Sequence, residues 1–261
     1  MLKSLGDELR NAESDIAKKL QGMVREQDGE CEYCGRPIFV QKYADGEVKV
    51  EECFCHETRR QNQRMKDIKA DTFYKSSLIN RKEKLHTFDG FIPEVQSEFE
   101  AKQSAIKFVE NFSEHLAEGE GILFQGSFGT GKTHLAASIG NELYKQKFKV
   151  LFIKFPWYLD KLRQTFKESK QRDDIYYKAL DADLLIIDEV WASQSYNSDF
   201  EVKELYKLTD ERMDKPTIYT TNYSSDDFLK NDLGRVFSRM LDSSELVILN
   251  GKDKRRRKIR R

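Results

Sequence analysis

The sequence predicts an α/β protein whose main domain is a doubly wound parallel sheet, preceded by a small N-terminal helical module. Two observations lead to this prediction. From about residue 120 onward, short apolar runs of strand length alternate with segments of helical periodicity, which is typical of parallel sheets covered on both faces. The first 80 residues are instead poor in apolar side chains and contain all four cysteines. We therefore predict a module at residues 1–80, a linker at 81–95 and the main domain at 96–261, ending in a basic tail.

Composition and charge narrow the class of protein. Charged residues make up 34% of the 261 residues, and no apolar run approaches the roughly 18 residues of a membrane span. The first residues lack a secretory signal, so we expect a cytoplasmic protein with no membrane association. The formal net charge is zero, yet residues 252–261 carry eight Lys or Arg and one Asp. This tail predicts contact with an anionic partner, the alternative being a solvated terminus.

All four cysteines lie within 25 residues, as Cys31-x-x-Cys34 and Cys53-x-Cys55. A reducing compartment disfavours disulfides, and two thiolate pairs about twenty residues apart are typical of a structural Zn²⁺ site. Four thiolates leave no open position for water, which disfavours a catalytic zinc. His56 is an alternative ligand, and a redox pair or unliganded thiols are alternatives to the metal.

Helical patterns flank the cysteines. Apolar residues from Leu5 to Met23 lie near one stripe of a helix, and residues 57–78 predict a polar helix rich in Lys and Arg. A module this poor in apolar residues needs a metal to stay folded. Such modules more often bind a partner than catalyse.

A phosphate-binding loop follows the short strand Ile122–Phe124. Its residues are Gly126, Ser127, Phe128, Gly129, Thr130, Gly131, Lys132 and Thr133. This Gly-x-x-x-x-Gly-Lys-Thr pattern lies between a predicted strand and a helix, the setting in which it is specific. The glycines let successive N–H groups face an anion, Lys132 reaches the β- and γ-phosphates, and the Thr133 hydroxyl coordinates Mg²⁺.

Two further strands add residues suited to the same chemistry. The apolar run from Asp183 ends in Asp188 and Glu189, which predicts that Asp188 holds the Mg²⁺ shell and that Glu189 polarises the attacking water as general base. The strand 216–221 is followed by Asn222, an amide able to orient that water. Alternatively, Asp188 and Glu189 only cap the strand. An Asp-Glu pair at this position favours an enzyme that hydrolyses nucleotides over a kinase that phosphorylates a small molecule.

The remaining elements complete the predicted sheet. Strands are expected near 121–125, 150–153, 183–188, 216–221 and 246–249, with helices between them. Phe99 to Leu116 predicts a helix ahead of the first strand. Trp157 and Tyr158 open another helix, where they are either core residues or, with nearby Lys and Arg, a surface for single-stranded DNA.

Five motifs of the sequence together resemble those of a known family. The motifs are Gly126–Thr133, Asp188–Glu189, Thr221–Asn222, Arg235-x-x-Ser-Arg239 and Gly251-x-Asp-x-Arg255. They are similar to those of the AAA+ (ASCE) P-loop NTPases that load replicative helicases, the DnaC/DnaI-like proteins, and of the related IstB-like transposition helpers. The resemblance implies that Phe88 and Phe91 lie near the adenine. The sequence departs from the family at Lys254, where an aromatic residue is usual.

The resemblance also implies roles for two arginines. Arg239 matches the arginine finger that completes the ATP site of a neighbouring subunit, with Arg235 as its substitute. Arg255 matches the sensor arginine that touches the γ-phosphate in its own subunit, and Arg256 and Arg257 are alternatives. A cation supplied by a neighbour makes hydrolysis depend on assembly.

These features predict an ATPase that cleaves ATP to ADP and phosphate, weakly until stimulated. We expect it to load a hexameric DnaB-type helicase onto single-stranded DNA in the initiation of DNA replication, with Mg²⁺ and Zn²⁺ as its metals and self-association through Arg239. An IstB-like transposition helper is one alternative. A nucleotide-gated adaptor with negligible hydrolysis is another.

Overall fold

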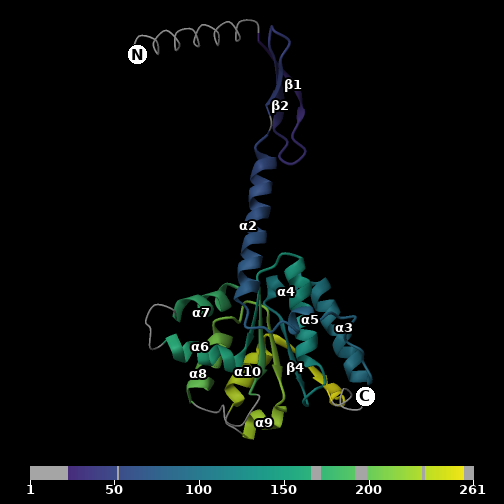
Figure 1. Ribbon diagram of the computed structural model, residues 1–261, viewed down its shortest axis with the longest axis vertical. Helices are drawn as coiled ribbons and strands as arrows, with labels where there is room; N and C mark the ends of the chain where they lie inside the picture. The colour runs from purple at the N-terminus through teal and green to yellow at the C-terminus, as the bar shows by residue number, and fades with distance from the viewer. Residues whose placement is uncertain (1–22, 52, 166–171, 192–198, 231–232, 256–261) are drawn as a thin grey trace. The chain divides into compact units, whose positions relative to one another are not determined.

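The computed structural model describes residues 23–51, 53–165, 172–191, 199–230 and 233–255 (Figure 1). The chain divides into two compact units, residues 1–65 and 66–261. The helix predicted from Leu5 onward falls in residues 1–22, outside the described part of the chain. Among the described helices, none combines the length and the apolar character needed to span a bilayer.

A three-stranded antiparallel sheet occupies the first unit. β1 (Val24–Glu30) pairs with β2 (Pro37–Lys42), which pairs with β3 (Val48–Glu51). We predicted helices on both sides of the cysteines and did not predict this sheet. Its clearest signal is the Asp45-Gly46 turn between β2 and β3, where Gly46 has a φ of 85°. Most side chains of these strands are exposed, including Val48 and Val50 of β3, so the sequence offered little sign of a buried face.

A five-stranded parallel sheet forms the centre of the second unit, in the order β5-β6-β7-β4-β8. The strands are β4 (Gly121–Gly126), β5 (Val150–Lys154), β6 (Leu184–Val190), β7 (Thr217–Thr221) and β8 (Ser244–Leu249). They confirm the predicted doubly wound sheet. Because β7 lies between β4 and β6, the carboxyl ends of these three strands lie side by side.

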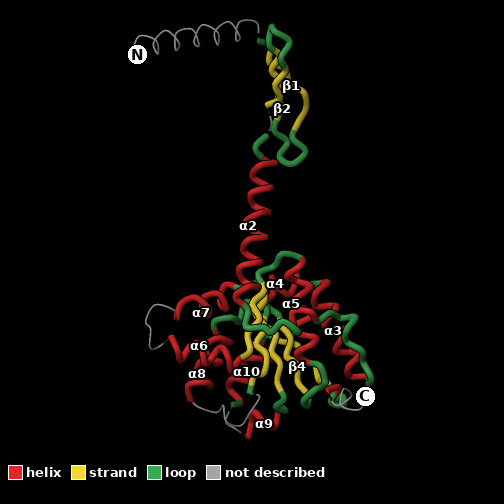
Figure 2. The backbone as a smooth tube through the Cα atoms, in the orientation of Figure 1, coloured by secondary structure: helices red, strands yellow, loops and turns green. Residues whose placement is uncertain are grey.

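Helices cover both faces of this sheet (Figures 1 and 2). They are α3 (Gln96–Glu110), α4 (Phe112–Glu118), α5 (Lys132–Lys145), α6 (Phe155–Thr165), α7 (Arg172–Asp181), α8 (Asp199–Asp210), α9 (Ser225–Lys230) and α10 (Gly234–Asp242). Successive strand residues point to opposite faces. Ile122 and Phe124 therefore join a core with α3 and α5, whereas Leu123 joins a core with α6, α7, α8 and α10.

Helix α2 (Cys55–Ser76) confirms the predicted polar helix, and its last turns belong to the second unit. Phe73 is buried in the core there. The N–H of Leu78 donates to the Phe152 carbonyl of β5 at 2.7 Å, and the N–H of Phe152 donates to the Ser77 hydroxyl at 2.9 Å. The second unit therefore starts within α2, earlier than the boundary predicted near residue 80.

The segment predicted as a linker, residues 81–95, packs on the same domain. It contains the short 3₁₀ helix η1 (Glu83–Leu85), and Phe91 within it is 2% exposed. The side-chain amide of Asn141 on α5 donates to the carbonyls of Glu83 at 3.1 Å and His86 at 2.8 Å. These bonds hold the segment against the helix that follows the phosphate loop.

Arg212 closes the end of the sheet opposite the phosphate loop. Its guanidinium is buried and donates to the Thr217 hydroxyl and to the carbonyls of Ala179, Leu180, Ala182 and Pro216. Burial lowers the pKa of Arg212 to about 10, so the group stays charged at neutral pH. A planar guanidinium with five donors is the side chain suited to this set of acceptors.

We predict that Arg212→Met lowers the free energy of unfolding by at least about 3 kcal/mol, because several buried acceptors lose their donor at once. Urea unfolding followed by circular dichroism measures this. Lys203→Met, at an exposed position of α8, is the control and should change stability by less than about 0.5 kcal/mol. Equal effects of the two substitutions would contradict the assigned role.

Candidate nucleotide-binding site

The phosphate loop joins β4 to α5, as predicted. It lies at the carboxyl edge of the sheet and at the N-terminus of α5, which begins at Lys132. Gly129 and Gly131 have φ angles of 75° and 101°, left-handed conformations that turn loop N–H groups toward one side. Thr130 is buried and donates its hydroxyl to the Ser127 carbonyl at 3.0 Å, which closes the loop on itself.

The Lys132 side chain lies along the loop. Its ammonium donates to the carbonyls of Gly126 and Ser127, each at 2.8 Å. Burial lowers the pKa of Lys132 to about 8, an effect partly opposed by the Asp188 carboxylate and reinforced by the charge of Arg255. A buried cation at the N-terminus of a helix favours an added anion such as a phosphate.

Asp188 is the most constrained side chain of the site. It is 0% exposed, and its Oδ1 accepts hydrogen bonds from the hydroxyls of Thr133 at 2.8 Å and Thr220 at 2.6 Å. Its Oδ2 is buried and has no hydrogen-bond partner among the described residues. Burial raises the pKa of Asp188 to about 6, although the two hydroxyls act in the opposite direction.

These residues fit a magnesium ion. Mg²⁺ takes oxygen ligands and is usually held by one or two protein groups together with substrate phosphates. The Thr133 hydroxyl and the Asp188 carboxylate provide such oxygens beside the loop, and the second carboxylate oxygen is available. The two residues predicted to hold Mg²⁺ are thus brought together by the fold.

Glu189 follows Asp188 in an unusual backbone conformation, with a φ of 61°. Its N–H donates to the Thr220 hydroxyl at 3.0 Å, which fixes the turn. Its carboxylate is partly exposed and lies 3.5 Å from the ammonium of Lys154. A left-handed non-glycine residue is uncommon and is often found at functional sites.

Lys154 and Glu83 belong to the site but were not predicted. The Lys154 ammonium lies 2.8 Å from Glu83, 3.5 Å from Glu189 and 3.9 Å from Asp188. Burial pushes the pKa of Lys154 down, but the Glu83 hydrogen bond and the carboxylate charges outweigh it and hold the pKa above its ordinary value. The available signal was a lysine ending an otherwise apolar strand, next to the strand that carries the two acids.

Asn222 follows β7 directly and is half-buried. The strand order places the carboxyl end of β7 between those of β4 and β6. Asn222 therefore lies at the edge shared by the phosphate loop and Glu189. This is the position expected for a side chain that orients a water molecule between them.

The aromatic residues differ in exposure. Phe91 is buried against the loop, where a Cβ at Gly131 would overlap its ring, and Phe88 is half-buried. Phe128 is exposed. Phe91 therefore supports the loop from behind, and Phe88 and Phe128 have more of their surface in solvent.

Arg255 and Arg239 lie in different surroundings. The Arg255 N–H donates to the Asp253 carboxylate at 3.0 Å, and its charge acts on Lys132 as noted above; Arg256 and Arg257 lie outside the described residues. Arg239 on α10 lies 3.3 Å from Asp210 and 3.6 Å from Asp242.

Arg235, the alternative to Arg239, lies over the Tyr206 ring, with its guanidinium carbon 5.6 Å from the ring centroid. Neither Arg235 nor Arg239 has a contact with the phosphate loop among the described residues.

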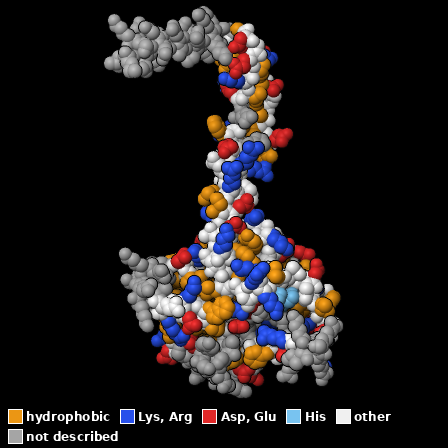
Figure 3. Space-filling model, viewed as in Figure 1, with side chains coloured by type: hydrophobic (Ala, Val, Ile, Leu, Met, Phe, Trp, Pro, Cys, Tyr) orange, Lys and Arg blue, Asp and Glu red, His pale blue; other side chains and the backbone are white. Residues whose placement is uncertain are grey.

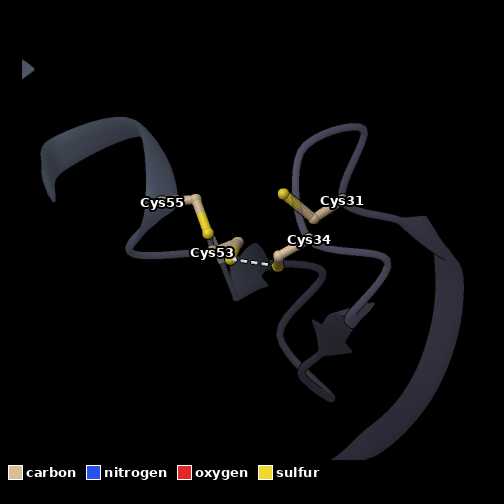
Figure 4. A group of neighbouring side chains, drawn as sticks. All are labelled: Cys31, Cys34, Cys53 and Cys55. Atoms are coloured by element: carbon tan, nitrogen blue, oxygen red, sulfur yellow. Dashed lines mark hydrogen bonds between the residues drawn. The ribbon is translucent and has the colours of Figure 1, made fainter. Parts of the chain in front are cut away.

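The four cysteines of the first unit converge, as Figure 4 shows. The sulfurs of Cys31, Cys34, Cys53 and Cys55 lie within 4.8 Å of one another. Tetrahedral coordination with metal–sulfur bonds of about 2.3 Å requires sulfurs about 3.8 Å apart, so the group can hold a metal ion.

Hydrogen bonds from Cys55, backbone and side chain, and from the Cys34 thiol lower the pKa of Cys53 to about 7, whereas the bond with Cys53 raises the pKa of Cys55 to about 12. The Cys53 thiol thus ionises more readily than an ordinary cysteine, and the Cys55 thiol less readily. The side chain of His56 lies outside the described part of the structure.

Of the two aromatic residues that open α6, one lies in the core and the other at the surface. Tyr158 is buried, whereas Trp157 is 47% exposed and has the Lys154 ammonium 5.3 Å from its ring centroid. Arg163 of the same helix pairs with Glu201. Of the two aromatic residues, only Trp157 has a ring face able to meet a base.

Comparison with known proteins identifies the family. The family described as IstB-like ATP-binding protein matches residues 53–261. The chain belongs to this family. Within the IstB-like family match lie the phosphate loop, Asp188, Glu189 and the arginines, whereas Cys31 and Cys34 precede it.

Two individual relatives within reach of sequence comparison are replicative helicase loaders. The replicative helicase loader DnaC of Escherichia coli K12 is 32% identical over 168 residues, which cover 63% of this chain and 66% of that protein. The replicative helicase loader DnaI of Bacillus subtilis is 22% identical over 214 residues, covering 77% of this chain and 67% of that protein. The match thus spans about two thirds of each loader.

Solved structures agree with the AAA+ P-loop fold. The crystal structure of the DnaC helicase loader superposes with a TM-score of 0.58 at 27% identity, over 65% of this chain and 99% of that one. AMPPCP-bound DnaA from Aquifex aeolicus gives a TM-score of 0.55 at 23% identity, over 70% of this chain and 55% of that one, and supports the fold alone.

We predict that Thr220→Val shifts the acid limit of Mg²⁺-dependent nucleotide binding to higher pH. The Thr220 hydroxyl favours ionised Asp188, so its removal raises the pKa of Asp188 above about 6 and protonates the carboxylate at a higher pH. Calorimetric titration with a non-hydrolysable ATP analogue between pH 5 and 8 measures the shift. Thr221→Val, whose hydroxyl bonds the Val190 carbonyl instead, is the matched control. Identical pH profiles for the two variants would contradict the prediction.

Proposed function

We propose that this protein is an ATPase that loads a hexameric DnaB-type helicase onto single-stranded DNA during the initiation of DNA replication. The observation that carries the proposal is a complete phosphate loop joined to Asp188 and Glu189 in a chain 32% identical to a replicative helicase loader. To the family membership it adds a partner, the helicase, and a reaction, ATP hydrolysis.

The residues of the site support ATP hydrolysis. Lys132 binds the β- and γ-phosphates, and Thr133 with Asp188 would hold Mg²⁺, which would supply positive charge to the phosphate oxygens. Glu189 takes a proton from the attacking water, and Asn222 orients that water. Water attacks the γ-phosphorus, the bond to the β-phosphate oxygen breaks, and ADP and phosphate leave.

Glu189 is held by an ion pair in this arrangement. Its carboxylate lies 3.5 Å from the Lys154 ammonium, a contact that it must leave to approach the attacking water. We therefore expect slow basal turnover until a partner releases this contact.

Arg239 is proposed to supply the stimulating charge to a neighbouring subunit. Its side chain is partly exposed and pairs with Asp210 and Asp242, contacts that it must leave to reach another subunit's γ-phosphate. A cation supplied in this way is worth roughly three to five decades in rate. Self-association would then switch hydrolysis on.

Separate regions are proposed to bind the helicase and the DNA. The cysteine module is assigned to the helicase because it is too poor in apolar residues to form a large core, and Phe54, 84% exposed, follows Cys53. Lys and Arg side chains cluster along the exposed surface of α2 (Figure 3), and this surface is assigned to the phosphates of single-stranded DNA. In the second unit, Trp157 and the basic C-terminal tail are each assigned to the same DNA, since an exposed aromatic ring suits bases and cations suit phosphates.

The cysteine group is proposed to hold a structural Zn²⁺ that keeps the first unit folded. We predict about one zinc per chain in protein purified under reducing conditions, lost in Cys31→Ser. Metal analysis by mass spectrometry measures it, and circular dichroism reports unfolding of the unit. Tyr33→Ser, two positions away, is the control and should keep the metal. Wild-type protein without zinc would contradict the assignment.

An IstB-like transposition helper is the second candidate, favoured by the family description. The cysteine pair Cys31 and Cys34, ahead of the family match, argues for a partner outside the ATPase itself. The two candidates differ in that partner. A DnaB-type helicase captured in an ATP-dependent manner separates them.

We predict that the full chain co-elutes with a DnaB-type helicase and that the helicase with single-stranded DNA stimulates ATP hydrolysis. Lys132→Ala should abolish nucleotide binding. Arg239→Ala should keep nucleotide affinity within about twofold and lose at least about a hundredfold of the stimulated rate, because the finger acts only in the transition state. Size-exclusion chromatography, calorimetry and phosphate release measure these effects.

Lys203→Met, at an exposed position of α8, serves as the control variant for this series. A helicase complex with no stimulated hydrolysis would favour the nucleotide-gated adaptor. Absence of any complex would overturn the loader proposal. Loss of nucleotide affinity in Arg239→Ala would argue against a role in another subunit.

A further inference from the structure

The C-terminal segment, residues 250–255, is seated against the phosphate loop. The backbone N–H of Lys254 donates to the Gly129 carbonyl at 3.1 Å. Gly251 approaches the start of α3 so closely that a Cβ there would overlap the Glu98 carboxylate. The segment is thus held to the loop at one point and to α3 at another.

The Lys254 ammonium fastens this segment. It lies 2.8 Å from Glu98 Oε2 and 2.5 Å from the Ile92 carbonyl, and it is 4.7 Å from the centroid of the Phe91 ring. Glu98 is 0% exposed, and the same oxygen accepts the N–H of Glu94 at 2.8 Å. A fully buried carboxylate strongly favours a cation beside it, since losing that partner leaves an uncompensated buried charge.

The fastened segment connects the two sides of the loop. Phe91, under the Lys254 ammonium, packs on Gly131. Arg255 is the next residue after Lys254, and its backbone is fixed by the bond from its N–H to the Asp253 carboxylate at 3.0 Å. When Lys254 is paired with Glu98, the backbone of Arg255 is therefore held at a fixed position beside the loop.

We propose that Lys254 is a positioning residue: by pairing with buried Glu98 it holds the C-terminal segment so that Arg255 reaches the γ-phosphate. The inference rests on the proposed ATPase function and on the role of Arg255 in it. The proposed role of Lys254 is exerted through Arg255, not through a contact of its own with the nucleotide. Its effect is on the distinction between ATP and ADP, which differ only in the group that Arg255 contacts.

The test compares nucleotide affinities of four variants with those of the wild type. Calorimetry in Mg²⁺ buffer measures the dissociation constants of ADP and of a non-hydrolysable ATP analogue for Arg255→Ala, Lys254→Met, the double variant and Lys252→Met. Lys254→Met and Arg255→Ala should each weaken binding of the ATP analogue about tenfold relative to ADP. The double variant should match Arg255→Ala within about twofold, because Lys254 acts through Arg255.

Lys252→Met removes an exposed lysine from the same segment and should keep the wild-type preference between nucleotides. If Lys254→Met is unfolded, Glu98→Gln combined with Lys254→Met removes the buried charge together with its partner and carries the same expectation. The Tm from thermal unfolding distinguishes a positioning role of Lys254 from a purely structural one. Equal weakening of ADP and the ATP analogue together with a lower Tm, or effects that multiply in the double variant, would overturn the positioning role.

The proposed function and the positioning role fail differently. A wild-type protein that binds neither nucleotide refutes the ATPase. A wild-type protein that prefers the ATP analogue, and keeps that preference in Lys254→Met, refutes only the role of Lys254. Loss of the preference in Lys254→Met but not in Arg255→Ala would also overturn it, since the effect would then bypass Arg255.

Discussion

The buried carboxylate of Asp188 is the point at which three parts of the ATPase domain are tied together. Thr133 belongs to α5 and Thr220 to β7, and both donate to the same oxygen of a residue on β6. These two bonds add to the strand pairing that holds the phosphate loop beside β6. The same burial raises the pKa of Asp188, so in the proposed site this residue would also set a lower pH limit for binding Mg²⁺.

Buried charge is balanced locally around this carboxylate. Lys154 contacts Glu83, Asp188 and Glu189, and it is the described cation that links the acids of the site to the segment after α2. On the other side of the loop, Lys254 forms an ion pair with the buried carboxylate of Glu98. Each lysine places a cation beside a buried carboxylate, which offsets part of the cost of burying that charge. The site is therefore built from paired charges on opposite sides of the loop.

The sequence predicted the parts of this arrangement that depend on neighbouring residues. All five parallel strands, α2, the phosphate loop and the Asp188–Glu189 pair follow from short patterns of apolar periodicity or fixed spacing. The partners Glu83–Lys154 and Glu98–Lys254 were not predicted, since each pair joins residues distant in the chain, 156 positions apart in the second case. The small sheet was missed because its strands are short and mostly exposed, so their few apolar residues do not mark a buried face. Sequence spacing also placed four thiols close together, a grouping that the structure shows directly.

The hydrogen bonds between the end of α2 and β5 have a consequence for solubility. β5 is the last strand on its side of the sheet, and such a border can recruit a strand from another molecule. At Phe152 both outward-facing main-chain groups are already engaged, the carbonyl by Leu78 and the amide by Ser77. A foreign strand would find no free groups at that residue. At its middle residue, β5 is thus closed to pairing with a strand of another molecule.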